Sequence, residues 1–220
     1  MIIYGLMKFI EKIPERYDKT MAILSLGGRK KAQNFMLQKI WKNGRILDIG
    51  CGTGTFLIRA AKNGAICEGV DSAIPMLDVF KNRLSKENLK TQNRIRINNI
   101  SASLLQKNFP PQSFDLIFCS FMLGELPELV QTSVLEQIPQ LLKKGGKLII
   151  CDEFWPENPI TSFLYKMFFA IAFVPNFILT RTMISPIKNI PSKLAKVGLK
   201  VLNRTKFAMG VVSVLEAEIL

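Results

Sequence analysis

The chain has 220 residues, 48% of them hydrophobic, and carries 30 Lys and Arg against 17 Asp and Glu, a formal net charge of +13. This length suits one domain with elaborations. The absence of histidine excludes imidazole metal ligands and histidine general bases, and we expect no metal site. The sequence has neither finger spacing nor an arginine-rich aromatic stripe, which argues against nucleic acid as a partner. The basic charge together with the apolar composition favours a membrane surface or a lipid-like substrate.

The four cysteines, Cys51, Cys67, Cys119 and Cys151, fall in or beside expected strands and form no close pair in the sequence. This placement predicts small core residues in a reducing compartment. The first residues lack the apolar run of a signal peptide. We therefore expect a cytoplasmic protein, or one peripheral to the inner face of the membrane.

Residues 1–43 predict an N-terminal helical cap. A short helix over 7–13 ends at Pro14, a second runs over 17–26, and a third, amphipathic helix runs over 29–41. Tyr17 is the residue of this cap that we expect to approach a bound ligand, although packing alone would also explain it.

A glycine-rich turn follows the first strand, which is expected over 45–49. The turn contains Gly50, Gly52 and Gly54 and opens a helix at Thr55, so we expect it to present amide N–H groups to a polar ligand. Asp71 ends the second strand, at the place where an acid accepts hydrogen bonds from a ribose. Because Thr55 occupies the place of the third glycine of a dinucleotide fingerprint, the spacing favours a ligand held by its nucleoside rather than by a pyrophosphate.

The remaining elements alternate. We expect helices over 55–62, 74–89 and 128–144, the last kinked or split by Pro139, and strands over 65–70, 95–98, 114–119, 147–151, 199–202 and 210–219. This order predicts an α/β fold with a doubly wound, mostly parallel sheet and an antiparallel last strand, the final two strands forming a hairpin at the sheet edge. Five segments fall at strand carboxyl ends and predict one crevice: 50–54, Asp71, Ser101, 119–125 and 152–155.

The wording Leu-Asp-Ile-Gly-Cys-Gly-Thr-Gly at 47–54 resembles the first motif of the class I S-adenosylmethionine (SAM)-dependent methyltransferases. Residues 44–152 are similar to the core of the ubiquinone and menaquinone methyltransferases, including Ser-Phe-Asp at 113–115 and Lys-Lys-Gly-Gly at 143–146. The resemblance implies a Rossmann-like methyltransferase fold with SAM as the cofactor.

The resemblance also implies where SAM binds. The three glycines would surround its methionine end with the help of Asp48, and Asp71 would bind its ribose. Ser101-Ala102 stands where the family commonly has Asp-Ala, which implies a weaker contact to adenine, with Asn99 as a nearby substitute. The full set of cofactor-binding candidates is Asp48, Gly50, Cys51, Gly52, Gly54, Asp71, Ser72, Ser101, Ala102 and Cys119.

The chain also resembles the narrower group of corrinoid-protein-associated methyltransferases. The shared wording is Pro-Glu-Arg-Tyr-Asp at 14–18, Glu-Leu at 125–126, Asp-Glu at 152–153 followed by Pro156, and Thr-Arg-Thr at 180–182. This resemblance implies a corrinoid-type acceptor or a corrinoid protein as partner. A quinone- or lipid-type acceptor and a non-catalytic SAM-binding module compete with it, and the sequence does not separate them.

The candidate catalytic residues are Glu125, Asp152 and Tyr17. Without histidine, a base at neutral pH would have to be a carboxylate with a raised pKa. Each acid would equally be explained as a loop carboxylate that accepts backbone N–H groups. A phenolate, a carbanion-like carbon or a reduced cobalt would need no base.

Residues 160–180 are apolar on all sides, yet Lys166 and Pro175-Asn176 interrupt them. We expect a helical insertion over 158–190 that lies above the acceptor pocket. A helix pair packed on the sheet, a membrane-dipping lid and a transmembrane span are the alternatives, and a membrane-anchored interaction protein would rest on this stretch alone. The expected division is thus a cap (1–43), a SAM-binding core (44–157), the insertion (158–190) and a C-terminal helix with strands (191–220).

Overall fold

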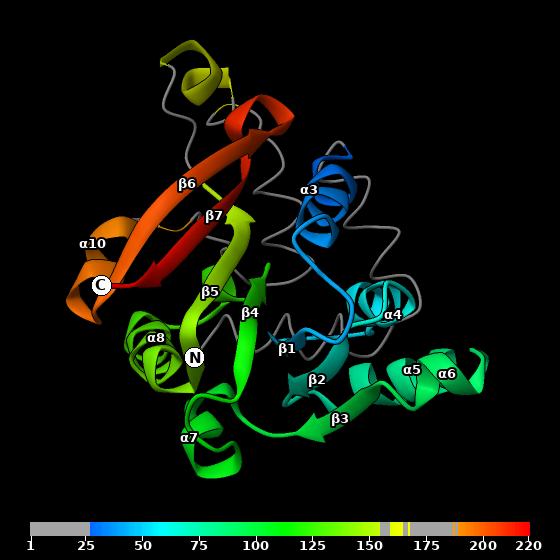
Figure 1. Cartoon of the computed structure of the whole chain (residues 1–220). Helices are drawn as coiled ribbons and strands as arrows, with labels where there is room; N and C mark the ends of the chain where they lie inside the picture. Colours follow the sequence, from blue (N-terminus) through cyan, green and yellow to red (C-terminus); the bar gives the residue numbers. More distant parts are fainter. Residues whose placement is uncertain (1–26, 155–158, 165–166, 168–186, 188) are drawn as a thin grey trace.

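The computed structural model describes residues 27–154, 159–164, 167, 187 and 189–220. Most of the predicted cap, most of the predicted insertion, Tyr17 and Trp155 lie outside these residues (grey in Figure 1). The described part contains the whole predicted core up to Phe154.

A seven-stranded sheet runs through the molecule in the order β3-β2-β1-β4-β5-β7-β6. The first five strands pair in parallel, whereas β7 is antiparallel to both β5 and β6. This confirms the predicted mostly parallel sheet with an antiparallel last strand. The strands are β1 (Arg45–Ile49), β2 (Ile66–Asp71), β3 (Ile95–Asn99), β4 (Phe114–Ser120), β5 (Leu142–Glu153), β6 (Leu199–Phe207) and β7 (Val212–Ile219).

Helices cover both faces of the sheet (Figure 1). On one face, α3 (Gly28–Leu37), α4 (Thr55–Lys62) and α5 (Ile74–Ser85) bury a core that includes Met36, Leu57 and Phe80. On the other, α7 (Leu105–Asn108), α8 (Glu128–Leu141) and α10 (Ile190–Lys196) bury a second core. Short 3₁₀ turns, η1 (Ala102–Leu104), η2 (Leu123–Glu125) and η3 (Ala208–Gly210), lie after β3, β4 and β6.

The boundary between α8 and β5 differs from the prediction. The helix ends at Leu141 and keeps Pro139 in its last turn, so the proline does not split it. The strand begins at Leu142 instead of Lys147, because Leu142 pairs with Phe114 and a register shift in β4 accommodates the glycine pair that follows. Gly145 takes a φ of +76°, which suits the irregularity. The final hairpin is also longer than predicted, since β6 extends to Phe207.

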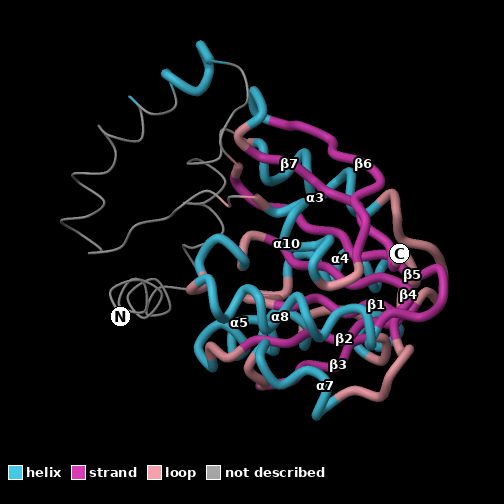
Figure 2. Tube along the Cα trace, turned by 90° about the vertical axis from the view of Figure 1, so that its left-hand side faces the viewer, coloured by secondary structure: helices cyan, strands magenta, loops and turns pink. Residues whose placement is uncertain are grey.

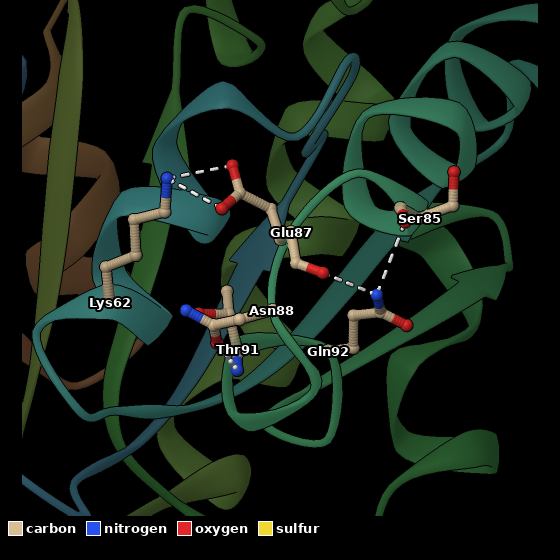
Figure 3. Close-up of polar contacts among 6 residues, drawn as sticks. All are labelled: Lys62, Ser85, Glu87, Asn88, Thr91 and Gln92. Atoms are coloured by element: carbon tan, nitrogen blue, oxygen red, sulfur yellow. Dashed lines mark hydrogen bonds and ion pairs between the residues drawn. The ribbon is translucent and has the colours of Figure 1, made fainter.

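The single helix predicted over 74–89 is in fact two. After α5 ends at Ser85, α6 (Leu89–Gln92) begins anew with Asn88 as its N-cap, whose side chain accepts the N–H of Thr91 at 2.9 Å. Gln92 Nε2 donates to the Glu87 carbonyl at 2.6 Å, and Lys62 Nζ of α4 lies 2.8 Å from the Glu87 carboxylate (Figure 3). The Asn88 cap thus provides a local alternative to helix continuation.

Candidate functional site

The glycine-rich turn between β1 and α4 uses its own N–H groups internally. Gly50 and Cys51 donate to the Val70 carbonyl at 2.8 and 3.0 Å, and Gly54 donates to the Cys51 carbonyl at 3.0 Å. Gly52 donates to Asp71 Oδ2 at 2.8 Å. These four N–H groups are therefore used within the protein, and of the amides expected to face a ligand, those of Gly50, Cys51, Gly52 and Gly54 already have partners.

Two of the glycines are required for different reasons. A Cβ on Gly54 would lie 2.0 Å from Phe80 Cδ2, so α5 packs directly against the turn. A Cβ on Gly52, where φ is +52°, would have no atom within 4 Å. The backbone at Gly52 therefore borders open space into which a ligand can approach closely.

Two carboxylates flank the turn. Half-buried Asp71 accepts the N–H of Ala73 through Oδ1 at 2.8 Å in addition to that of Gly52, and the backbone N–H of Ser72 also acts on this carboxylate. Burial raises the pKa of Asp71, and these N–H groups oppose the rise. Asp48 is 2% exposed and its Oδ1 has no hydrogen-bond partner. Burial, and to a lesser extent the charge of Asp71, raise the pKa of Asp48 well above its usual value. A ligand could supply the hydrogen-bond donor that Asp48 Oδ1 lacks.

A side chain that the sequence pattern did not indicate, that of Arg83, forms hydrogen bonds with the turn. Arg83 of α5 donates to Thr53 Oγ1 at 2.9 Å and to Thr55 Oγ1 at 2.7 Å. It thus joins the last residues of the turn to the first of α4. No local motif marks Arg83, because it lies about thirty residues further along the chain.

The other predicted cofactor contacts lie around the same edge of the sheet. Ser72 is exposed after β2, and exposed Ser101 caps η1, its Oγ 3.4 Å from the Ser103 N–H. Ala102 is half-buried behind it. Exposed Asn99 donates through Nδ2 to the Asp71 carbonyl at 3.0 Å. Cys119 is completely buried in the core, which leaves its backbone rather than its thiol toward the crevice.

A second group of charged residues lies beyond β4 and β5. Burial raises the pKa of Glu125 in η2 to about 8 and that of Asp152 in β5 to about 7, and it also raises the pKa of Glu153. Arg29 of α3 lowers all three values. Asp152 accepts the N–H of Gly124 at 3.2 Å and that of Glu153 at 2.8 Å. We call Glu125, Asp152 and Glu153 the acid cluster.

The structure therefore brings together Glu125 and Asp152 of the three predicted catalytic candidates. Arg29 was expected only as part of a helix, and no feature of its sequence neighbourhood predicts its place beside the acid cluster. The carboxyl edge of the sheet thus has a turn that can receive a nucleoside, and acids with pKa values near neutrality that can take or hold a proton. Within the described part of the chain, no helix has the length and apolarity to cross a membrane.

Comparison with known proteins agrees with this geometry. Residues 46–146 match the family described as Methyltransferase domain. The demethylmenaquinone methyltransferase of Bacillus licheniformis is 29% identical over 161 residues, which cover 72% of this chain and 67% of that protein. The matched residues include the glycine-rich turn, Asp71 and Glu125.

Solved structures share the fold. The magnesium protoporphyrin IX methyltransferase of Synechocystis PCC 6803, with bound S-adenosylhomocysteine (SAH), aligns with a TM-score of 0.66 and 18% identity, covering 86% of this chain and 83% of that chain. A SAM-dependent methyltransferase of Aquifex aeolicus aligns with a TM-score of 0.65 and 18% identity, covering 94% of this chain and 98% of that chain. At this identity the likeness concerns the fold.

Proposed function

We propose that this chain, a class I SAM-dependent methyltransferase, methylates a small, hydrophobic, quinone-type acceptor at the crevice between the glycine-rich turn and the acid cluster. The observation that carries the proposal is the similarity to demethylmenaquinone methyltransferase over 72% of the chain. The acid cluster supports it, because it lies next to the predicted cofactor site and burial raises the pKa values of Glu125 and Asp152 to about 8 and about 7.

SAM is the cofactor, and the residues at the turn fit it. The open side of Gly52 admits a ligand against the backbone, the unpartnered Asp48 Oδ1 can accept a donor from its amino-acid end, and the lone pairs of Asp71 can accept ribose hydroxyls. Ser101 and Asn99, both exposed at the end of β3, are the residues that we propose for the contact with adenine. When bound, SAM supplies a methyl group already activated by a sulfonium.

The chain's own task is then to orient the acceptor and to manage one proton. We assign Glu125 the contact with an acceptor hydroxyl, because it is the more exposed of the two predicted acids. Asp152 lies deeper and, with a pKa of about 7, is half ionised at neutral pH. A hydroxyl proton taken up by this pair would leave an electron-rich ring that can accept the methyl group at a carbon. That carbon then loses its ring proton and the hydroxyl regains its own, so that one proton is released in all.

The acceptor should be neutral where it meets the acid cluster. Among the residues that the structure describes, Glu125, Asp152 and Glu153 are three acids beside one cation that lowers their pKa values, Arg29. A carboxylate or phosphate placed there would add a further negative charge to a partly desolvated group of acids. A quinol hydroxyl avoids that cost and offers a proton to the ionised acid.

Two finer predictions extend this proposal. A corrinoid acceptor or corrinoid protein stays a prediction from the sequence wording, part of which lies outside the described residues. Peripheral membrane contact is supported by four exposed apolar side chains at helical spacing, Ile160, Phe163, Leu164 and Met167, which are 49–72% exposed. Together with the net charge of +13, they suit an anionic bilayer, and we propose that the enzyme works in the cytoplasm or against its membrane.

The test is methyl transfer from methyl-labelled SAM to chemically reduced 1,4-naphthoquinol by the purified chain. We expect label in the organic phase, at a ring carbon by mass spectrometry. The matched control is Gly52→Val, which should fill the open side of the turn and abolish the label. A reduced corrinoid is assayed in parallel.

Each outcome decides between the candidates. Label on the corrinoid and none on the quinol would replace the quinone proposal by the corrinoid one. Label on neither, with SAH still bound by calorimetry, would favour a non-catalytic SAM-binding module.

A further inference from the structure

The start of α3 is fixed at the carboxyl edge of the sheet. A Cβ on Gly28 would lie 2.8 Å from Ala208 Cβ and 3.2 Å from Val212 Cγ2, so the helix touches β7 and η3 where only glycine fits. Val212 pairs with Glu153 at the end of β5. Figure 2 shows α3 beside β7 along this edge. The residue that follows Gly28, Arg29, is therefore delivered to the end of β5 by tight backbone packing.

Arg29 meets the loop after β4 through Phe121. Its guanidinium carbon lies 3.9 Å from the centroid of the Phe121 ring, within the range of a cation–π contact. Phe121 has a φ of +55°, which is rare for a residue with a side chain, and its N–H donates to the Cys151 carbonyl at 2.7 Å. The stacked Arg29 thus helps to hold a strained residue three positions before Gly124, whose N–H binds Asp152.

The charges around this contact are unbalanced. The charge of Arg29 in α3 lowers the pKa of Glu125, whereas the charges of Asp152 and Glu153 in β5 and of Asp71 in β2 raise it. The charge of Glu153 raises the pKa of Asp152, and that of Arg29 lowers it. Within the described ranges, Arg29 is the positive charge that lowers the pKa of each acid of the cluster. Without it, mutual repulsion would favour additional bound protons.

We propose that Arg29 is a positioning residue for the acceptor site: it stacks on Phe121, which fixes the loop that carries Glu125, and it places a positive charge beside the acid cluster. The inference deepens the proposed function and rests on it for the catalytic consequence. Arg29 needs no contact with the acceptor. It ties the orientation of the loop and the ionisation of the acid cluster to the seating of α3.

The direct test follows the Glu125 carboxyl carbon by NMR across a pH titration of ¹³C-Glu-labelled protein, with Glu125→Gln used to assign the signal. In Arg29→Met we expect the midpoint to rise by about one pH unit, because a nearby positive charge is lost. Arg29→Lys should keep most of the charge and a near-normal midpoint. Lys30→Met is the matched control, since Lys30 is an exposed neighbour on the same helix and should leave the midpoint unchanged.

An unchanged midpoint in Arg29→Met, or an equal rise in Lys30→Met, would overturn the inference. If Arg29→Met does not fold, Phe121→Leu tests the same contact, because Arg29 would lose its stacking partner and the midpoint should rise by a smaller amount; no rise overturns the inference. The titration needs no acceptor, so its result is independent of whether a quinol is methylated. With an active acceptor, Arg29→Met should shift the pH dependence of kcat upward and leave the SAM KM within about twofold.

Discussion

The two sides of the carboxyl edge are built by different means. On the β1–β2 side, one short stretch of chain makes the site, and hydrogen bonds from backbone N–H groups hold it in place. The Val70 carbonyl accepts two of these N–H groups, and the Asp71 carboxylate accepts two more. On the β4–β5 side, the acids and the arginine come from residues 29, 125, 152 and 153. The first side has a fixed shape, whereas the second has an adjustable charge.

This difference matters for how each side tolerates change. A turn held by backbone hydrogen bonds and glycine packing has one geometry, so it fails abruptly when a Cβ is added. A cluster of coupled acids shifts its proton occupancy gradually when one charge changes. We call the β1–β2 side, where we propose that SAM binds, the cofactor side, and the β4–β5 side the acceptor side. Substitutions on the cofactor side should therefore alter cofactor binding and folding, and those on the acceptor side should alter the pH dependence of stability and activity.

The largest effect should separate the two glycines of the turn. Gly54→Ala would place a methyl group against Phe80, at 2.0 Å, in a backbone conformation with φ of +73°, and should cost about 3 kcal/mol or more of unfolding free energy in urea melts. In Gly52→Val the added Cβ would meet no atom within 4 Å but would strain the backbone at φ of +52°, so the variant should fold with a smaller loss of about 1–2 kcal/mol and no longer bind SAH by calorimetry. A Gly54→Ala variant as stable as the parent, or SAH binding by Gly52→Val, would disprove the roles given to them.

The next effect concerns Asp71. Asp71→Ala removes the acceptor of the Gly52 and Ala73 N–H groups together with the proposed ribose contact, and should weaken SAH binding by about 1.5–3 kcal/mol. Asp78→Ala is the matched control, since Asp78 lies on α5 with a 62% exposed side chain. Equal SAH affinities of the Asp71 and Asp78 variants would show that the ribose contact is wrongly assigned.

On the acceptor side, the prediction is a pH dependence of stability. Burial raises the pKa of Glu125 from 4.5 to about 8, so the folded state retains a proton that the unfolded chain has released. This contribution is fully present below pH 4.5 and is lost as pH rises through about 8. Glu125→Gln should therefore match the parent at pH 4 and exceed its unfolding free energy by about 1–2 kcal/mol at pH 9.

Glu128→Gln provides the control three residues further along. Lys193 lowers the pKa of the exposed Glu128 through a hydrogen bond and its charge. Replacing Glu128 should thus give no gain at pH 9 and a small loss. A parallel gain in both variants would point to the general loss of a negative charge and not to burial of Glu125.

The same contrast explains what the sequence could predict. The alternation of strands and helices, the glycine-rich turn and Asp71 depend on local periodicity and spacing, and they were found within a few residues. Pairing of Leu142 with Phe114 and the Asn88 cap moved two element boundaries, because a cross-strand contact and a local cap prevailed over the apolar pattern. The local sequence also suggested Glu125 and Asp152 as candidate catalytic residues, since both follow predicted strands.

Their raised pKa values were not predictable, because burial and the shared Arg29 depend on how α3 packs on β7. The use of the turn's N–H groups likewise depends on Val70, a residue of the neighbouring strand. Sequence reasoning therefore predicted the turn and Asp71 at the carboxyl edge of the sheet, but not the hydrogen bonds that four of the turn's amides make within the protein. On the acceptor side it found the acids but not the charge between them.

The smallest effect tests whether the rigid shape of the cofactor side depends on more than its own backbone. Arg83→Met would remove the hydrogen bonds to Thr53 and Thr55 and let the start of α4 relax. We expect SAH affinity to fall about fivefold, the loss of roughly one net hydrogen bond, with little change in unfolding free energy. Arg59→Met is the control, because Arg59 of α4 bonds only to the exposed Asn34 side chain among the contacts described for it. An unchanged affinity in Arg83→Met would mean that the glycines and Asp71 alone fix the turn, and the two sides of the edge would then differ even more sharply.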